Sequence, residues 1–160
     1  MIRLKRIGHV LVRVLDLERS RQFYTKVLGF EVMEQDPEHG GLFMALDGQA
    51  HTLDLFPVAD PAAARTMAAG DAGVQHVAFQ VDREAALADA YWSLVDHGVA
   101  IARTVDHVSQ KSIYFRDPDG NLLEIYYERP DARELFRHGR HDQDAPLVFD
   151  RRPPSAGALG

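Results

Sequence analysis

The stretches Ile7-Gly-His-Val-Leu-Val12 and Val74-Gln-His-Val-Ala-Phe79 each open one copy of a layout that the chain carries twice in tandem. Each copy has a histidine near its start and a carboxylate near its end. These residues are His9 with Asp54 in the first copy, and His76 with Glu124 in the second. Imidazoles and carboxylates are ligands that first-row divalent metals accept. The repeat therefore predicts a duplicated scaffold that presents a metal site.

Composition excludes several other kinds of protein. The chain has 160 residues, is 46% hydrophobic and carries a formal net charge of −6 without a long basic run, so we expect one domain with a real core and no nucleic-acid partner. It has no cysteine, which rules out disulfides and thiolate ligands. No apolar run approaches the roughly 20 residues that cross a bilayer, and no signal-peptide core follows the N-terminus. We expect a cytoplasmic protein that does not engage a membrane.

The first copy alternates apolar and polar residues over 7–15, which predicts a strand. Asp16 then stands where a helix N-cap belongs, and Gly29 stands where that helix would end. Three further strands are predicted; they cover residues 30–35, 42–47 and 51–58.

The second copy repeats this order. A strand over 75–81 precedes a helix that Asp82 caps and Gly98 ends. Three strands follow near 99–106, 112–117 and 121–128. The sequence thus predicts an α+β fold of two tandem strand-helix-three-strand (βαβββ) modules that form curled mixed sheets around a shared metal-binding cleft.

The modules cover about 5–58 and 74–128, within one domain over 1–128. The connector 59–73 is rich in Ala and predicts a short helix plus a linker. Residues 129–160 differ in character, being rich in charge and proline. We expect a helical turn near 132–137 there and then a loose or partner-bound tail.

Strand parity indicates where the four repeated residues point. Successive side chains of a strand face opposite sides of a sheet. In each first strand the valine-rich face should pack under the helix, which turns His9 and His76 to the other side. In each last strand the flanking apolar residues do the same for Asp54 and Glu124. Shared parity favours one polar pocket, although it does not prove proximity.

The segment Asp117-Pro-Asp-Gly120 is typical of a tight hairpin turn. If Asp117 pairs with Asn121, Tyr114 lies directly opposite Glu124, within reach of a metal that Glu124 holds. The same logic applied to the first copy places Met44 opposite Asp54. The two copies would then differ in chemistry on a common scaffold.

These motifs resemble the vicinal oxygen chelate superfamily, which includes glyoxalase I, fosfomycin-resistance proteins, bleomycin-binding proteins and extradiol dioxygenases. Four stretches carry the resemblance, and together they span about residues 5–128. They are Gly-His-Val-Leu-Val (8–12), Phe-Tyr-Thr-Lys-Val-Leu-Gly-Phe (23–30), His-Val-Ala-Phe (76–79) and Tyr-Phe-Arg-Asp-Pro-Asp-Gly-Asn-Leu-Leu-Glu (114–124).

In detail the chain is most similar to single-domain extradiol dioxygenases, which cleave catechol-like rings. The resemblance implies Fe(II) bound by His9, His76 and Glu124. It implies His51 and Tyr114 as the residues that handle protons, with His107 helping to hold the substrate's oxygens. By parity, Arg13 and Gln80 share the predicted inner faces and are candidate contacts to the small-molecule substrate.

Asp54 keeps two alternatives open. Extradiol members usually carry a small residue there, whereas glyoxalase-type members place a fourth ligand. With four ligands for Ni, Zn, Co or Mn, the protein would be a glyoxalase-like isomerase, lyase or epimerase. A third possibility is a non-enzymatic module that binds a small molecule such as an antibiotic. Many members of the superfamily pair, so we expect a homodimer.

Overall fold

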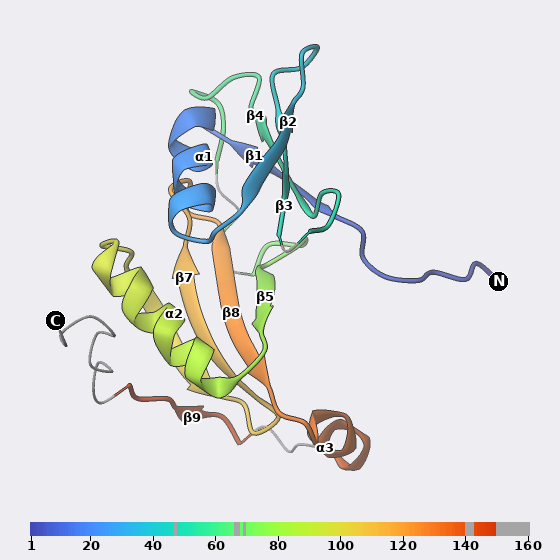
Figure 1. Cartoon of the computed structure of the whole chain (residues 1–160), viewed down its shortest axis with the longest axis vertical. Coiled ribbons are helices and arrows are strands. Elements are labelled where there is room, and N and C mark those ends of the chain that lie inside the picture. Colours follow the sequence, from blue (N-terminus) through green and yellow to red (C-terminus); the bar gives the residue numbers. More distant parts are fainter. Residues whose placement is uncertain (47, 66–67, 69, 140–142, 150–160) are drawn as a thin grey trace, which may run out of the picture. The chain divides into compact units, whose positions relative to one another are not determined.

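The computed structural model in Figure 1 describes residues 1–46, 48–65, 68, 70–139 and 143–149. The chain forms two compact units, of which the first contains Met1–Met67 with Asp117–Gly120 and the second contains Ala68–Arg116 with Asn121–Gly160. Each unit holds one strand-helix-three-strand module. The α+β class and the duplicated element order are therefore confirmed.

The first unit is a four-stranded sheet with one helix, in the strand order β1-β4-β3-β2. Strand β1 runs parallel to β4, while β3 is antiparallel to both of its neighbours. The elements are β1 (Val10–Val14), α1 (Leu17–Lys26), β2 (Glu31–Gln35), β3 (Leu42–Ala45) and β4 (Leu53–Pro57).

Helix α1 begins and ends where the sequence predicts. The Asp16 side chain accepts a hydrogen bond from the Arg19 amide at 3.0 Å, which satisfies one of the free N–H groups of the first turn. Gly29 follows the helix with φ of +77°, a conformation that glycine adopts at little cost. The helix packs against β4 and helps bury the unit's core, whose members include Val14, Tyr24, Phe30, Met44, Leu53 and Leu55.

The turn 117–120 packs against α1 through polar contacts. The buried Tyr24 hydroxyl donates to Asp117 Oδ2 at 3.0 Å, and the Asp117 carboxylate is itself only 5% exposed. Ser20 donates to Asp119 Oδ2 at 3.1 Å, and Arg19 forms an ion pair with the same carboxylate. The predicted turn is thus held by specific hydrogen bonds to the helix.

The second unit is a five-stranded sheet with the order β5-β8-β7-β6-β9, and α2 lies across it in contact with β5, β7 and β8 (Figure 1). Leu87 and Leu94 of the helix are buried with Ile113, Phe115 and Leu123 of the sheet. The elements are β5 (Val77–Val81), α2 (Glu84–Asp96), β6 (Ile101–Asp106), β7 (Gln110–Arg116), β8 (Leu122–Glu128), α3 (Ala132–His138) and β9 (Ala145–Pro146).

Three details differ from the sequence prediction. The N-cap of α2 is Arg83 rather than Asp82, because extended backbone continues through Arg83 and its side chain makes no capping bond. The described residues of the connector 59–73 form turns and no helix. The tail is not wholly loose, since β9 pairs with β6.

Strand register confirms one predicted pair and corrects the other. Tyr114 lies opposite Glu124, as the hairpin predicts. Asp54 pairs with Phe43, however, so the prediction of Met44 was wrong by one residue. A one-residue shift exchanges the faces of a strand. Met44 instead lies opposite Leu53, and both side chains are buried. In this register Met44 shares the apolar face with Leu53, and Asp54 lies on the other face of the sheet.

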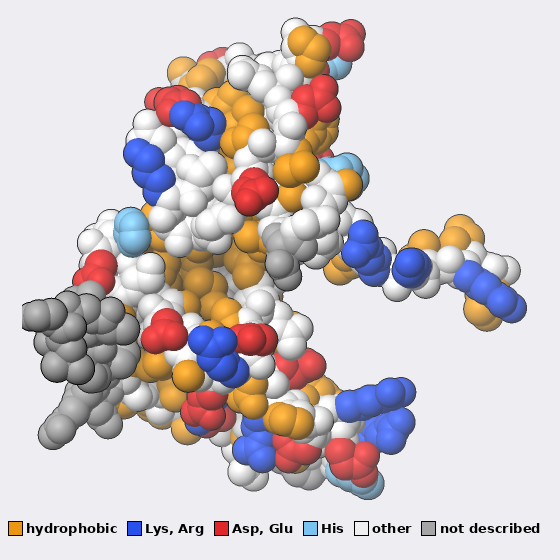
Figure 2. Space-filling view, viewed as in Figure 1, with side chains coloured by type: hydrophobic (Ala, Val, Ile, Leu, Met, Phe, Trp, Pro, Cys, Tyr) orange, Lys and Arg blue, Asp and Glu red, His pale blue; other side chains and the backbone are white. Residues whose placement is uncertain are grey.

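Within the part of the chain that the structure describes, no helix is long and apolar enough to cross a membrane. The segment before β1 extends away from the first sheet and carries interspersed apolar and basic side chains (Figure 2). Met1, Ile2, Leu4 and Ile7 of this segment are exposed.

Candidate metal centre

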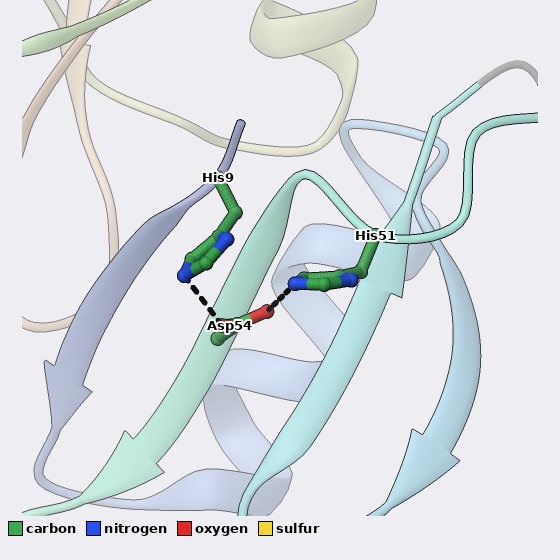
Figure 3. A group of neighbouring side chains, drawn as sticks. All are labelled: His9, His51 and Asp54. Carbon is green, nitrogen blue, oxygen red and sulfur yellow. Dashed lines mark ion pairs between the residues drawn. The ribbon is translucent and has the colours of Figure 1, made fainter. Parts of the chain in front are cut away.

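The first unit gathers three potential metal ligands at the start of two neighbouring parallel strands. His9 directly precedes β1, His51 lies in the loop before β4, and Asp54 is the second residue of β4. The Val10 amide donates to the Thr52 carbonyl at 3.1 Å, which aligns the starts of the two strands. As a result the two imidazoles and the carboxylate point toward one another (Figure 3).

The geometry of this cluster suits a cation. One ligand atom from each residue lies within 4.8 Å of the other two. His9 Nε2 is 3.6 Å from Asp54 Oδ2, and His51 Nε2 is 4.0 Å from Asp54 Oδ1. The Asp54 side chain is 4% exposed, whereas those of His9 and His51 are 49% and 37% exposed. The carboxylate is thus buried, whereas the two imidazoles beside it are partly exposed to solvent.

Asp54 Oδ1 has no hydrogen-bond partner although it is buried. Phe43, opposite Asp54 on β3, contributes an apolar ring that meets His51 edge-on at a centroid distance of 5.7 Å. A buried carboxylate without donors is costly. A bound cation would compensate this oxygen, so the residues present fit a metal.

The second unit places its own histidine and carboxylate together. His76 Nε2 is 3.0 Å from Glu124 Oε2, where His76 directly precedes β5 and Glu124 lies on the adjacent parallel strand β8. The Glu124 side chain is 3% exposed. Its other oxygen accepts a hydrogen bond from Gln110 Nε2 at 3.0 Å. Unlike Asp54, Glu124 therefore has a partner for each oxygen.

Tyr114 lies beside this pair. Its ring meets the His76 ring edge-on at 5.7 Å, and the Arg103 guanidinium sits 4.3 Å from its centroid. Burial raises the pKa of the Tyr114 hydroxyl, and the Glu124 charge raises it further. The phenol accordingly stays protonated and remains a hydrogen-bond donor.

His107 connects Tyr114 to the C-terminal segment. Its Nε2 is 3.0 Å from the Tyr114 hydroxyl, and its Nδ1 is 2.7 Å from Asp144 Oδ1. A carboxylate accepts hydrogen bonds, which favours the tautomer with the proton on Nδ1 and leaves Nε2 to accept from the phenol. Val108, the next residue, has φ of +68°, which is strained for a β-branched side chain.

A family model described as the Glyoxalase/Bleomycin resistance protein/Dioxygenase superfamily matches residues 6–125. The chain belongs to this superfamily. Among its relatives is a catechol-2,3-dioxygenase of Bacillus subtilis (strain 168), which is 34% identical over 78% of this chain and 42% of its own length. A biphenyl-2,3-diol 1,2-dioxygenase of Rhodococcus globerulus is 29% identical over 84% of the chain and 70% of its own length. The chain thus spans less than half of the catechol-2,3-dioxygenase that it matches.

Solved structures support the superfamily fold. The glyoxylase/bleomycin resistance protein/dioxygenase domain from Frankia sp. EAN1pec matches with a TM-score of 0.67 at 22% identity, covering 80% of this chain and 95% of that one. At this identity the likeness shows the fold alone.

The predicted site residues fall into the two units described above. The predicted triad takes His9 from the first unit and His76 and Glu124 from the second, so it stays a prediction. Arg13 Nη1 donates to the Pro57 carbonyl at 3.0 Å, and Gln80 accepts a weak hydrogen bond from the Tyr126 hydroxyl at 3.4 Å. Their predicted contacts with substrate also stay predictions.

Sequence reasoning missed three residues that contact Glu124, Tyr114 or His107. Gln110 shares strand β7 and its parity with Tyr114, so alternation could have found it. Arg103 is the register partner of Tyr114 on β6, which the bulge in that strand concealed. Asp144 lies beyond the repeat in the tail, where no periodic pattern pointed to it.

Proposed function

We propose that the protein is an Fe(II)-dependent extradiol dioxygenase that cleaves a catechol-like ring. In this proposal His9, His76 and Glu124 hold the metal, as the resemblance implies, and the substrate is a small aromatic diol. The observation that carries the proposal is the second-unit arrangement of His76 and Glu124 beside the Tyr114–His107 hydrogen bond. The dioxygenases among the relatives support it.

His76 and Glu124 have the separation expected for two ligands of one ion. Metal–ligand bonds of about 2.0–2.2 Å at tetrahedral angles place donor atoms roughly 3.4 Å apart, and octahedral angles bring them closer. The 3.0 Å between Nε2 and Oε2 lies within this range. A metal held by these residues would supply a Lewis acid for the diol and for its reaction with dioxygen.

The chain's own groups then hold and move protons. Tyr114 donates its hydroxyl hydrogen to a diol oxygen, and His107 Nε2 is the acceptor that orients this hydroxyl when no substrate is present. His51 accepts a proton from the diol as the ring opens, because a neutral imidazole takes up protons near neutral pH. Both oxygen atoms of dioxygen enter the product as the ring C–C bond beside the diol breaks.

Anaerobically purified protein loaded with Fe(II) should consume one dioxygen per catechol and form a yellow ring-cleaved product. An oxygen electrode and visible spectroscopy on a panel of catechols measure both quantities. The Tyr114→Phe variant should bind the same amount of iron but turn over more slowly by about 100-fold or more, as expected for a lost acid–base group. Iron bound without turnover on the whole panel would contradict the proposal.

A second candidate function rests on the unpaired Asp54 oxygen. If Asp54 binds the metal as a fourth ligand, a glyoxalase-like isomerase, lyase or epimerase becomes the better assignment. Asp54→Ala in the full chain separates the candidates. Oxygen uptake retained by Asp54→Ala at saturating Fe(II) favours the dioxygenase. A large loss of Ni(II) or Zn(II) affinity, with no oxygen uptake by the parent protein, favours the second candidate.

Asp144 should matter for rate although it lies in the tail. Asp144→Asn keeps the size of the side chain but allows it to donate to His107, which disturbs the tautomer that accepts from Tyr114. We expect kcat to fall by about 10–100-fold, the range for losing a residue that orients a site group, with little change in KM. Steady-state oxygen uptake measures both constants.

The matched control is Asp131→Asn. Asp131 is an exposed tail carboxylate whose side chain pairs with Arg129 at 2.9 Å. This variant should retain the parent kinetics. Equal kinetics for Asp144→Asn and the parent protein would remove Asp144 from the proposed chemistry.

A further inference from the structure

We infer that the first unit binds a first-row divalent cation by itself, through His9 Nε2, His51 Nε2 and the Asp54 carboxylate. This inference goes beyond the proposed function. His51 acts here as a ligand instead of a proton acceptor, and neither His76 nor Glu124 is needed. An imidazole nitrogen that binds this cation can neither accept a proton nor bind a second ion, so the roles of His9 and His51 here and in the proposed function belong to different states of the protein.

The first argument is that Asp54 has a buried oxygen without a hydrogen-bond partner. Its side chain is 4% exposed, yet Oδ1 has no hydrogen-bond donor. The two nearest basic atoms, His9 Nε2 and His51 Nε2, lie 3.6 and 4.0 Å from the carboxylate, beyond ordinary hydrogen-bond length. The carboxylate is thus buried facing two nitrogens that do not satisfy it.

The second argument is the arrangement of the donors. The three ligand atoms lie within 4.8 Å of one another. Bonds of about 2.0–2.2 Å to a common ion would bring them to roughly 3.4 Å or less, a contraction that rotation of two partly exposed imidazoles can supply. The His9 and His51 ring centroids are 4.7 Å apart with a tilt of 39°, so the rings flank the carboxylate without blocking it.

The third argument is chemical selectivity. Two imidazoles and one carboxylate suit Fe(II), Co(II), Ni(II) or Zn(II) better than Mg(II) or Ca(II), which prefer oxygen ligands. His9 and His51 keep large exposed fractions, which gives the ion access from solvent and leaves positions for water. Glu124 differs from Asp54 in that Gln110 donates a hydrogen bond to one of its oxygens, so the unpaired oxygen is a feature of the first-unit site.

Co(II) binding to the full chain carrying His76→Ala and Glu124→Gln tests the inference. The metal-free protein is titrated by calorimetry and by Co(II) absorption, and X-ray absorption counts the imidazole ligands. We expect about one Co(II) per chain with two imidazoles. Adding His51→Ala or Asp54→Asn should weaken Co(II) binding by more than about 100-fold. Losing a residue that only hydrogen-bonds to a metal ligand typically costs about 10–100-fold in metal affinity, so a larger loss indicates a direct ligand.

The matched control on the same background is His39→Ala. His39 also forms a pair with an aspartate of the first unit, Asp36, at 3.1 Å, but it has no second imidazole beside it. This control should bind Co(II) as the double variant does. If the double variant does not fold, His76→Ala alone serves in the same comparison, since its imidazole is partly exposed.

The outcomes separate this inference from the proposed function. A double variant that folds and binds no Co(II), or whose binding does not depend on His51, overturns the inference whatever the parent protein does with catechols. A parent protein that fails to cleave catechols, beside a double variant that binds Co(II) through His51, overturns the proposed function and supports the inference.

Discussion

Replacing Glu124 with alanine should reduce oxygen-dependent catechol cleavage by more than about 100-fold. Loss of an outer partner of a metal ligand typically costs 10–100-fold in affinity or activity, and a direct ligand should cost more. The substitution removes the carboxylate that lies 3.0 Å from His76 and accepts from Gln110. Turnover per chain, measured with saturating Fe(II), reports the effect.

Glu128→Ala is the matched control on the same strand, because Glu128 is exposed at the end of β8. It should leave turnover unchanged. Iron analysis of Glu124→Ala is a separate measurement. The variant keeps His9, His51 and Asp54, so it should still bind iron in the first unit although its turnover is lost. Activity of Glu124→Ala near the parent level would exclude Glu124 as a ligand of the reacting metal.

Tyr24→Phe should lower the free energy of unfolding by about 1–3 kcal/mol, the cost of leaving a buried polar group without its hydrogen-bond partner. Tyr24 is fully buried, and its hydroxyl donates to the nearly buried Asp117 carboxylate at 3.0 Å. The substitution keeps the ring and therefore the apolar packing. Urea unfolding followed by circular dichroism measures the change.

Tyr126→Phe offers the same chemical change at a weak contact. The Tyr126 hydroxyl donates to Gln80 at 3.4 Å in an exposed setting, so this variant should unfold at nearly the parent urea concentration. If the two variants were equally stable, the Tyr24–Asp117 bond would not hold the turn to α1.

Much of the fold could be predicted because two strong local signals agree along the chain. Alternation and the Asp16 cap define the first strand and helix, and the repeat extends the same order to the second module. The Asp-Pro-Asp-Gly turn fixed the pairing of Tyr114 with Glu124. The loop between β3 and β4 also contains an Asp-Gly dipeptide, at 47–48. Because β3 ends at Ala45 and β4 begins only at Leu53, this dipeptide alone does not determine the register, and the predicted pairing of Met44 was wrong by one residue.

The candidate site was predictable only in part. Parity identified His9, Asp54, His76 and Glu124, since the alternating pattern records which face each side chain takes. It could not show that Glu124 has two partners while Asp54 Oδ1 has none, because side-chain distances decide this. It could not find Asp144 either, since the contact between the tail and His107 depends on a strand pairing outside the repeat.

The short strand β9 also affects how the second sheet ends. It pairs with β6, placing Ala145 and Pro146 opposite Asp106 and Val105, and so occupies an edge that would otherwise offer free backbone groups to another chain. Proline has no N–H to donate, so Pro146 makes the new edge a poor template for further strand addition. The segment that carries Asp144 thus protects this sheet edge against aggregation. Deleting this segment would remove the Asp144 carboxylate and would also expose the backbone edge of β6 to pairing with another chain.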